Sequence, residues 1–190
     1  MKINFTLVVS TIVIGLYYFG YMMLHTPPPI NPWELKIYPT SKHSSQFYTT
    51  GMKPKYEGDA CLDLRVSSDI AIDPNRNTVT VPYHIQAGLF KHGLPHSFML
   101  IPRSSLFNSG LSTQSPSIID AGYRGLLDSR FSFTFRGYAK PTILTGTALI
   151  QLCTPDLQFP LITVVNDSLP LIDGRGDQRY GSSGNTFVAW

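Results

Sequence analysis

The chain has 190 residues, enough for one domain with a sizeable core and not comfortably for two. Its net charge of +3 is small and no block of Lys or Arg resembles a nucleic-acid footprint, so we expect no nucleic acid among its partners. Fifteen glycines and fifteen prolines interrupt the chain, which argues against a helical bundle and favours many short strands.

The N-terminal residues 3–24 contain no charged side chain and match the roughly 20 apolar residues that span a bilayer. Tyrosines crowd the second half of this segment, as aromatic residues do near a membrane interface. We therefore predict a single-pass membrane protein with a transmembrane anchor in residues 1–25 and a stiff proline-rich linker in residues 26–37. The alternatives are a cleaved signal peptide, whose apolar region is usually shorter, and a buried core helix.

The side of the membrane on which the domain lies is poorly determined. Lys2 is the one lysine before the apolar segment, and the next cationic side chain after it is Lys36. The positive-inside rule then weakly places the N-terminus in the cytoplasm and the domain across the membrane. Asn166, Asp167 and Ser168 form a glycosylation sequon, which matters only if the domain is lumenal.

After the linker, short runs rich in β-branched and aromatic residues alternate with turn signals. This spacing predicts an all-β sandwich or barrel, with one short helix near residues 104–111. The strand candidates are residues 63–72, 78–90, 96–102, 130–135, 147–153 and 160–165.

The two cysteines, Cys61 and Cys153, lie in apolar runs far apart in the sequence. No CxxC and no Cys/His cluster accompanies them, so we predict no zinc site. We favour two buried free thiols over a disulfide.

Five stretches carry polar residues in unusual apolar or glycine-rich settings, and each has an ordinary explanation when taken alone. A carboxylate can end a strand or sit in a turn, hydroxyls can cap a helix, an amide can be satisfied in a core, and a Gly/Ser-rich tail can be disordered. The five stretches are ACLDL (60–64), PRSSLFNSGL (102–111), SIIDAGYRG (117–125), GTALIQL (146–152) and RGDQRYGSSG (175–184).

Taken together and in this order, the five stretches resemble the five motifs of the trimeric dUTP diphosphatase (dUTPase) family. The resemblance implies a jelly-roll-like β-barrel or sandwich in residues 38–174, a flexible C-terminal lid in residues 175–190, and a homotrimer with active sites between subunits. It also implies hydrolysis of dUTP to dUMP and diphosphate, which keeps uracil out of DNA. The implied cofactor is Mg²⁺, held mainly by the triphosphate and water.

The resemblance assigns three catalytic residues. Asp120 matches the aspartate that activates the water attacking the α-phosphorus, a role that a well-placed carboxylate can fill. Asp63 matches the aspartate that organises the catalytic and metal-water network. Gln151 matches the amide that contacts the α-phosphate region.

The same motifs assign the substrate-binding residues. Base and sugar recognition falls to Ser117, Ile118 and Ile119, whose backbone would pair with uracil, to Tyr123 under the deoxyribose, and to Gln114, where the family frequently has Asn. The phosphate cradle comprises Arg103, Ser104 and Ser105, which supply a guanidinium and hydroxyls to an anion. The lid residues are Arg175, Tyr180, Gly181 and Ser182, with Tyr180 in place of the family's Phe over uracil.

The chain departs from the family pattern chiefly in two places. Thr147 and Ala148 replace the Asp-Arg pair of motif four, and Gln178 and Arg179 replace two glycines before the lid aromatic. Because the principal catalytic positions are filled, we predict an active enzyme. The alternatives are a structural or regulatory protein that reuses the fold at a membrane, and a dCTP deaminase-like enzyme.

Overall fold

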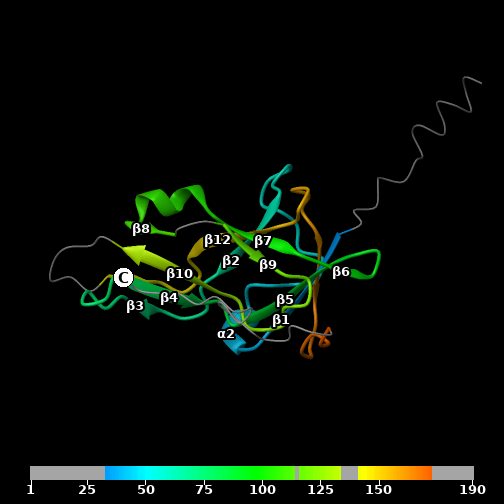
Figure 1. The fold of residues 1–190 in the computed structure, drawn as a ribbon, viewed down its shortest axis with the longest axis horizontal. Helices are drawn as coiled ribbons and strands as arrows, with labels where there is room; N and C mark the ends of the chain where they lie inside the picture. Colours follow the sequence, from blue (N-terminus) through cyan, green and yellow to red (C-terminus); the bar gives the residue numbers. More distant parts are fainter. Residues whose placement is uncertain (1–32, 114–115, 134–140, 173–190) are drawn as a thin grey trace, which may run out of the picture. The chain divides into compact units, whose positions relative to one another are not determined.

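Short strands are the main secondary structure of the described residues, as the sequence predicts. The structure is a computed structural model that describes residues 33–113, 116–133 and 141–172, all within one compact unit of residues 31–190. These residues form thirteen strands, the four-residue helix α2 (Lys42–Ser45) and the 3-10 helix η1 (Ser104–Asn108) (Figure 1). The prediction of an all-β domain is confirmed, and η1 occupies the position of the predicted short helix.

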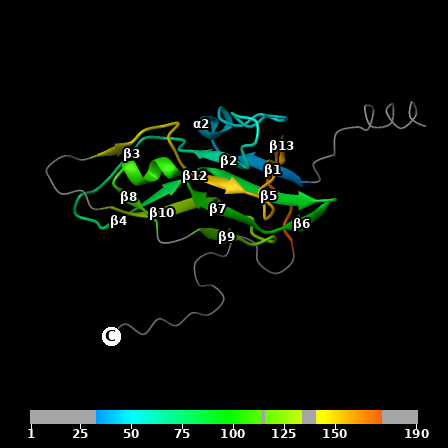
Figure 2. The same cartoon turned by 90° about the horizontal axis from the view of Figure 1, so that it is seen from above.

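Two four-stranded sheets supply most of the framework. The first has the order β13 (Leu161–Val164), β1 (Trp33–Pro39), β5 (Ile85–Lys91) and β6 (Leu94–His96), with β1 and β13 parallel. The second has the order β2 (Cys61–Arg65), β12 (Ala148–Cys153), β7 (Phe98–Pro102) and β9 (Ser117–Ile119). In Figure 1 the second sheet lies above the β1–β5 pair, and Figure 2 shows the same strands from above.

Two smaller sheets complete the pairing. One joins β4 (Thr78–Pro82), β10 (Asp128–Phe133) and β8 (Leu111–Ser112), and the other joins β11 (Thr142–Ile143) and β3 (Ile70–Ala71).

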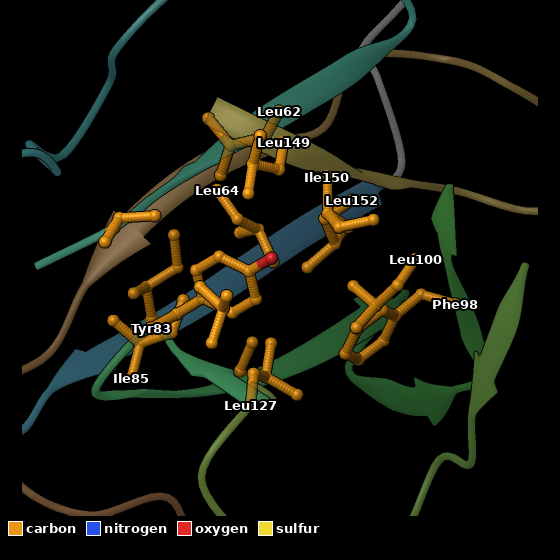
Figure 3. Packing of buried hydrophobic residues seen from close by; sticks show 14 of the residues in the cluster. Leu62, Leu64, Tyr83, Ile85, Phe98, Leu100, Leu127, Leu149, Ile150 and Leu152 are labelled. Carbon is orange, nitrogen blue, oxygen red and sulfur yellow. The ribbon is translucent and has the colours of Figure 1, made fainter. Parts of the chain in front are cut away.

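The core lies between the two large sheets. Leu62 and Leu64 point inward from β2 toward Tyr83, and Leu127 lies on the opposite side of the cluster (Figure 3). Burial raises the pKa of the Tyr83 hydroxyl, so this side chain stays neutral at physiological pH. The inward residues alternate with outward residues along β2, and this alternation frees one face of the strand for a site.

The linker prediction is too long at its C-terminal end. β1 begins at Trp33, so residues 33–37, expected in the linker, are part of the first sheet. Trp33, Leu35 and Ile37 are buried and alternate with half-buried neighbours, a period-two pattern too short to recognise directly after a proline-rich run. The Trp33 indole nitrogen also donates a 2.8 Å hydrogen bond to the Asp156 carboxylate, which anchors the start of the strand.

Two predicted strands are each divided in the structure. Residues 63–72 cover the end of β2 and all of β3, and residues 78–90 cover β4 and most of β5. The second break falls at His84, whose φ of 51° lies in the left-handed region and cannot continue a strand. The His84 carbonyl instead accepts a 2.9 Å hydrogen bond from the Thr40 amide.

The predicted membrane anchor, residues 3–24, lies outside the described residues. Across residues 33–113, 116–133 and 141–172, no helix combines the length and apolar character that crossing a bilayer requires.

The prediction of free thiols is wrong, because Cys61 and Cys153 form a disulfide. The register of β2 and β12 places the two residues directly opposite each other, with their Cα atoms 4.5 Å apart. This separation lies within the range that a disulfide bridges without moving the backbone. The pairing was missed because 92 residues separate the cysteines and the strand register cannot be read from composition.

We expect reduction of this disulfide to destabilise the domain. Opening a loop of this length lowers the free energy of unfolding by up to about 4.6 kcal/mol, mainly by relaxing the unfolded chain. The measurement is the melting temperature of the protein with and without dithiothreitol. The matched control is the Cys61→Ala/Cys153→Ala variant, which should melt lower than the oxidised protein and be insensitive to reductant. A wild-type melting temperature that reductant leaves unchanged would contradict the assignment.

Candidate active site

The outer face of β2 carries the first group of candidate residues. Along this strand Leu62 and Leu64 are buried, whereas Cys61, Asp63 and Arg65 are only partly buried on the opposite face. The alternation follows from the period of two residues along a strand. The core therefore holds β2 by its leucines and leaves Asp63 and Arg65 on the same accessible face.

Strand register brings the motif-four amide to the same face. Gln151 on β12 is paired with Asp63 on one side and with Ile101 on the other. Directly paired residues share a face of the sheet, so Gln151 and Asp63 are neighbours. Arg103 directly follows β7, the next strand across, and reaches back toward β2.

Two guanidinium groups hold the Asp63 carboxylate. Arg103 Nε lies 2.8 Å from Asp63 Oδ1, and Arg65 Nη2 donates to Asp63 Oδ2 at 3.3 Å. The arginines also donate to main-chain oxygens, Arg103 to Ala148 at 3.2 Å and Arg65 to Gly146 at 3.1 Å. Asp63 thus ties together three of the five predicted motifs, and its charge keeps both guanidinium groups oriented.

A pocket of about 350 Å³ opens over this cluster. It contains three of the predicted site residues, Asp63, Arg103 and Gln151. Its volume lies within the range of small-molecule sites. The remaining lining residues are Phe47, Met52, Lys53, Pro54, Lys55, Tyr56, Asp59, Ala60, Cys61, Leu62, Arg65 and Phe159.

Tyr48 supports the floor of this region. Its hydroxyl accepts a 3.1 Å hydrogen bond from the backbone amide of Arg65. Burial raises the pKa of Tyr48 to about 12, partly opposed by that hydrogen bond and by the charge of Arg65. The phenol is therefore protonated at neutral pH and acts as a structural hydrogen-bonding group, not as a base.

Ser104 and Ser105 lie at the start of η1, immediately after Arg103, and both are exposed. Neither lines the pocket, but both directly follow Arg103 in the chain. Their predicted role in the phosphate cradle stays a prediction.

The motif-three hairpin lies at the other end of the sheet. β9 is an edge strand that pairs antiparallel with β7, Ile119 opposite Phe98 and Ser117 opposite Leu100. Asp120 follows Ile119 and so lies near the start of β7, whereas Arg103 follows its end. Asp120 and Gln151 are separated by four residues in the strand direction and by two strand spacings across the sheet. These offsets correspond to a distance of about 15 Å. One chain therefore does not bring Asp120 together with Asp63, Arg103 and Gln151.

Exposure along the hairpin differs from residue to residue. Ser117 is exposed and Ile118 is 71% exposed, whereas Ile119 and Asp120 are partly buried. Tyr123 is almost entirely buried, and its hydroxyl donates a 3.0 Å hydrogen bond to the Leu126 carbonyl. The ring therefore offers a ligand only a small part of its surface.

Arg124 is a structural residue that the sequence did not single out. Its buried guanidinium donates to the main-chain oxygens of Ala121, Tyr123 and Pro170. Burial lowers the pKa of Arg124. These hydrogen bonds fix the turn after Asp120 and tie it to the chain segment that leads to the predicted lid. No local pattern distinguishes such an arginine from a solvated one, since its partners are main-chain carbonyl groups, one of them 46 residues away.

Arg65 was also missed, although a signal was present. It lies two residues after Asp63 on a predicted strand, so period-two alternation places both on one face. The remaining predicted residues, Gln114, Arg175, Tyr180, Gly181 and Ser182, lie outside the described residues, and their roles stay predictions.

Comparison with known proteins agrees with the five motifs. The dUTPase family model matches residues 48–184 of the chain. The chain belongs to the dUTPase family. It is 33% identical over 141 residues to a deoxyuridine 5'-triphosphate nucleotidohydrolase of Corynebacterium glutamicum, covering 70% of this chain and 87% of that protein. It is 32% identical over 134 residues to the protein of the same name from a Mycobacterium species, covering 68% of this chain and 84% of that protein.

Solved dUTPase structures are also similar to the chain. The native EIAV dUTPase has 27% identity and a TM-score of 0.43, and the match covers 63% of this chain and 85% of that one. A variant dUTPase from phage phi11 of S. aureus has 16% identity and a TM-score of 0.49, covering 74% of this chain and 99% of that one.

Within this dUTPase hairpin, Gly125 is required by the packing of Tyr123. A Cβ at position 125 would lie 2.7 Å from Tyr123 Cζ, which is too close for real atoms. We expect Gly125→Ala to push the ring out of its site and to lower the free energy of unfolding by about 1–3 kcal/mol, measured by urea denaturation.

The matched background for this test is Tyr123→Leu, because the shorter side chain lacks the clashing ring atoms. In that background Gly125→Ala should cost less than about 0.5 kcal/mol. An equal cost in both backgrounds would show that Tyr123 is not what excludes a side chain at position 125.

Proposed function

We propose that the chain hydrolyses dUTP to dUMP and diphosphate. The observation that carries this proposal is the convergence of Asp63, Arg103 and Gln151 in one pocket of a chain that belongs to the dUTPase family. Arg103 offers a guanidinium to the phosphate chain, and Gln151 offers an amide donor. These groups suit an anionic ligand whose charge changes during the reaction.

Asp120 supplies the general base in this proposal. It takes a proton from a water molecule whose oxygen attacks the α-phosphorus. The bond from the α-phosphorus to the bridging oxygen then breaks, and diphosphate leaves with the electron pair. Asp63 acts through the arginines that it orients.

We propose a homotrimer in which one subunit supplies Asp120 to the pocket of another. The separation of about 15 Å between Asp120 and Gln151 within one chain supports this, because a general base must lie within hydrogen-bond reach. A closed ring of three heterologous contacts gives each of three pockets one hairpin.

Mg²⁺ fits this site as an ion carried by the nucleotide. Both Asp63 oxygens are engaged by arginines, and among the described residues no three metal-ligating side chains cluster together. When bound, the ion would neutralise charge on the phosphate chain. The chain's own arginines hold that phosphate chain at the pocket.

The predicted lid would complete the pocket. Arg175, Tyr180, Gly181 and Ser182 would cover phosphate and uracil, and closure of such a segment excludes water. Ser117, Ile118 and Ile119 would present backbone groups to the base, while Tyr123 supports the sugar and Gln114 the hairpin. Ser104 and Ser105 would extend the phosphate contacts of Arg103.

Subunit mixing tests the reaction and the shared site together. We expect Asp120→Asn to lower diphosphate release from dUTP by at least about 100-fold, because the general base is lost. Arg103→Ala should be similarly inactive. Co-expressing the two variants should restore up to about a quarter of the wild-type activity, since random assembly produces pockets with both residues intact.

The matched control co-expresses Arg103→Ala with Gln151→Ala, both of which alter the same subunit's pocket. This pair should stay inactive. A wild-type chain that releases no diphosphate from dUTP would refute the activity. If the wild type is active but the mixture of Asp120→Asn and Arg103→Ala recovers no activity, the shared site is refuted and the activity is not.

We further propose that residues 3–24 anchor the enzyme in a membrane. Their uncharged composition supports this, and the Cys61–Cys153 disulfide favours an oxidising compartment for the domain. The full chain should stay in the membrane pellet after alkaline carbonate extraction, whereas a chain lacking residues 1–26 should not. Release of the full chain into the supernatant would contradict the anchor.

A further inference from the structure

The loop of residues 48–60, which precedes β2, lines one side of the pocket and overlaps the five motifs only at Ala60. It contributes Lys53, Lys55 and Asp59 to the lining. Neither strand nor helix is present between Tyr48 and Ala60. An irregular segment therefore forms this wall of the pocket. The contacts of its charged residues indicate what those residues do.

Hydrogen bonds hold this loop in place. Near its start, the Gly51 amide donates to the Ile162 carbonyl at 2.8 Å, and Thr50 Oγ1 accepts from the Val164 amide at 3.0 Å. At its far end, Cys61 is joined to Cys153. Both ends are thus attached to the two large sheets, so the lysines between them are carried by an anchored wall.

The tip of the loop is a closed turn. The Tyr56 amide donates to Asp59 Oδ2 at 3.0 Å, and the Asp59 amide donates to the Tyr56 carbonyl at 3.1 Å. Gly58 occupies this turn with a φ of 93°, which favours glycine. The carboxylate of Asp59 therefore helps to hold the turn, and among the described residues it forms no ion pair with Lys53 or Lys55.

The charges around the pocket are unbalanced. Four cationic side chains line it, Lys53, Lys55, Arg65 and Arg103, against the two carboxylates of Asp59 and Asp63. Asp63 is already shared by both arginines. Across the described ranges, no ion pair involves Lys53 or Lys55, although the Lys55 ammonium lies 5.0 Å from the Tyr56 ring centroid. A cleft lined by excess charge of one sign concentrates ligands of the opposite sign.

We infer that Lys53 and Lys55 form a second cationic wall that binds the phosphate chain of the nucleotide, in addition to the guanidinium of Arg103 in the same pocket. The ligand class is a linear polyphosphate, and this inference rests on the proposed function for the identity of the nucleotide. The lysines bind substrate and transition state alike, so they set the affinity for the phosphates more than the chemical step.

The test is calorimetric binding to the Lys53→Gln/Lys55→Gln variant of the full chain. The probes are inorganic tripolyphosphate, a non-hydrolysable imido analogue of dUTP, and dUMP. We expect the affinity for tripolyphosphate and the analogue to fall about tenfold or more, because two charge-assisted contacts are lost. The affinity for dUMP should change less than about threefold, and added salt should narrow the difference between variant and wild type.

The matched control is Lys42→Gln/Arg76→Gln, which removes the same net charge at exposed positions outside the pocket. Steady-state kinetics with dUTP give a second measurement, in which KM should rise in the pocket variant while kcat stays close to wild type. Equal melting temperatures show that all three proteins are folded.

Unchanged tripolyphosphate affinity in the pocket variant, or an equal loss in the control, would overturn the inference. Absence of tripolyphosphate binding to the wild type would also overturn it. Failure of the proposed function is a different result, namely no diphosphate release from dUTP, and the tripolyphosphate comparison can be made in that case as well.

Discussion

The carboxylate of Asp63 organises the pocket, because it is shared between the guanidinium groups of Arg65 and Arg103. Two cations around one anion leave a net positive charge, and each arginine keeps further N–H groups for main-chain oxygens or a ligand. The pairs are partly exposed, so they contribute little to the free energy of unfolding and mainly fix geometry. Removing Asp63 would therefore disturb orientation in three motifs at once.

The framework behind this pocket is rigid for reasons that are separate from the site. Leucines on the inner face of β2 pack in the core, while the disulfide joins β2 to β12 beside Asp63 and Gln151. The same disulfide holds the end of the 48–60 loop. A phosphate-binding surface gains from such support, since charged groups that are already oriented lose less conformational entropy when the ligand binds.

Local alternation made the all-β class and the shared face of Asp63 and Arg65 predictable from the sequence. Non-local strand register was not predictable, so the Cys61–Cys153 pairing was predicted wrongly. β1 was missed for a local reason, because its short alternating pattern directly follows a proline-rich run. The hydrogen bond from Arg124 to Pro170 and the cationic wall of the 48–60 loop depend on partners distant in the sequence. Family motifs supplied Asp63, Arg103 and Gln151, which the structure brings together, whereas physical reasoning on each residue alone left ordinary explanations open.

The position of β9 links packing to catalysis. Among the described residues it is an edge strand of its sheet, and Ile118 on it is 71% exposed, a combination that favours contact with another chain. Burying this edge against a second subunit would remove Ile118 from water and carry Asp120 toward a pocket that its own chain cannot reach. In the proposed homotrimer, assembly and activity would depend on the same contact, because the exposed Ile118 lies two residues before Asp120, the proposed general base.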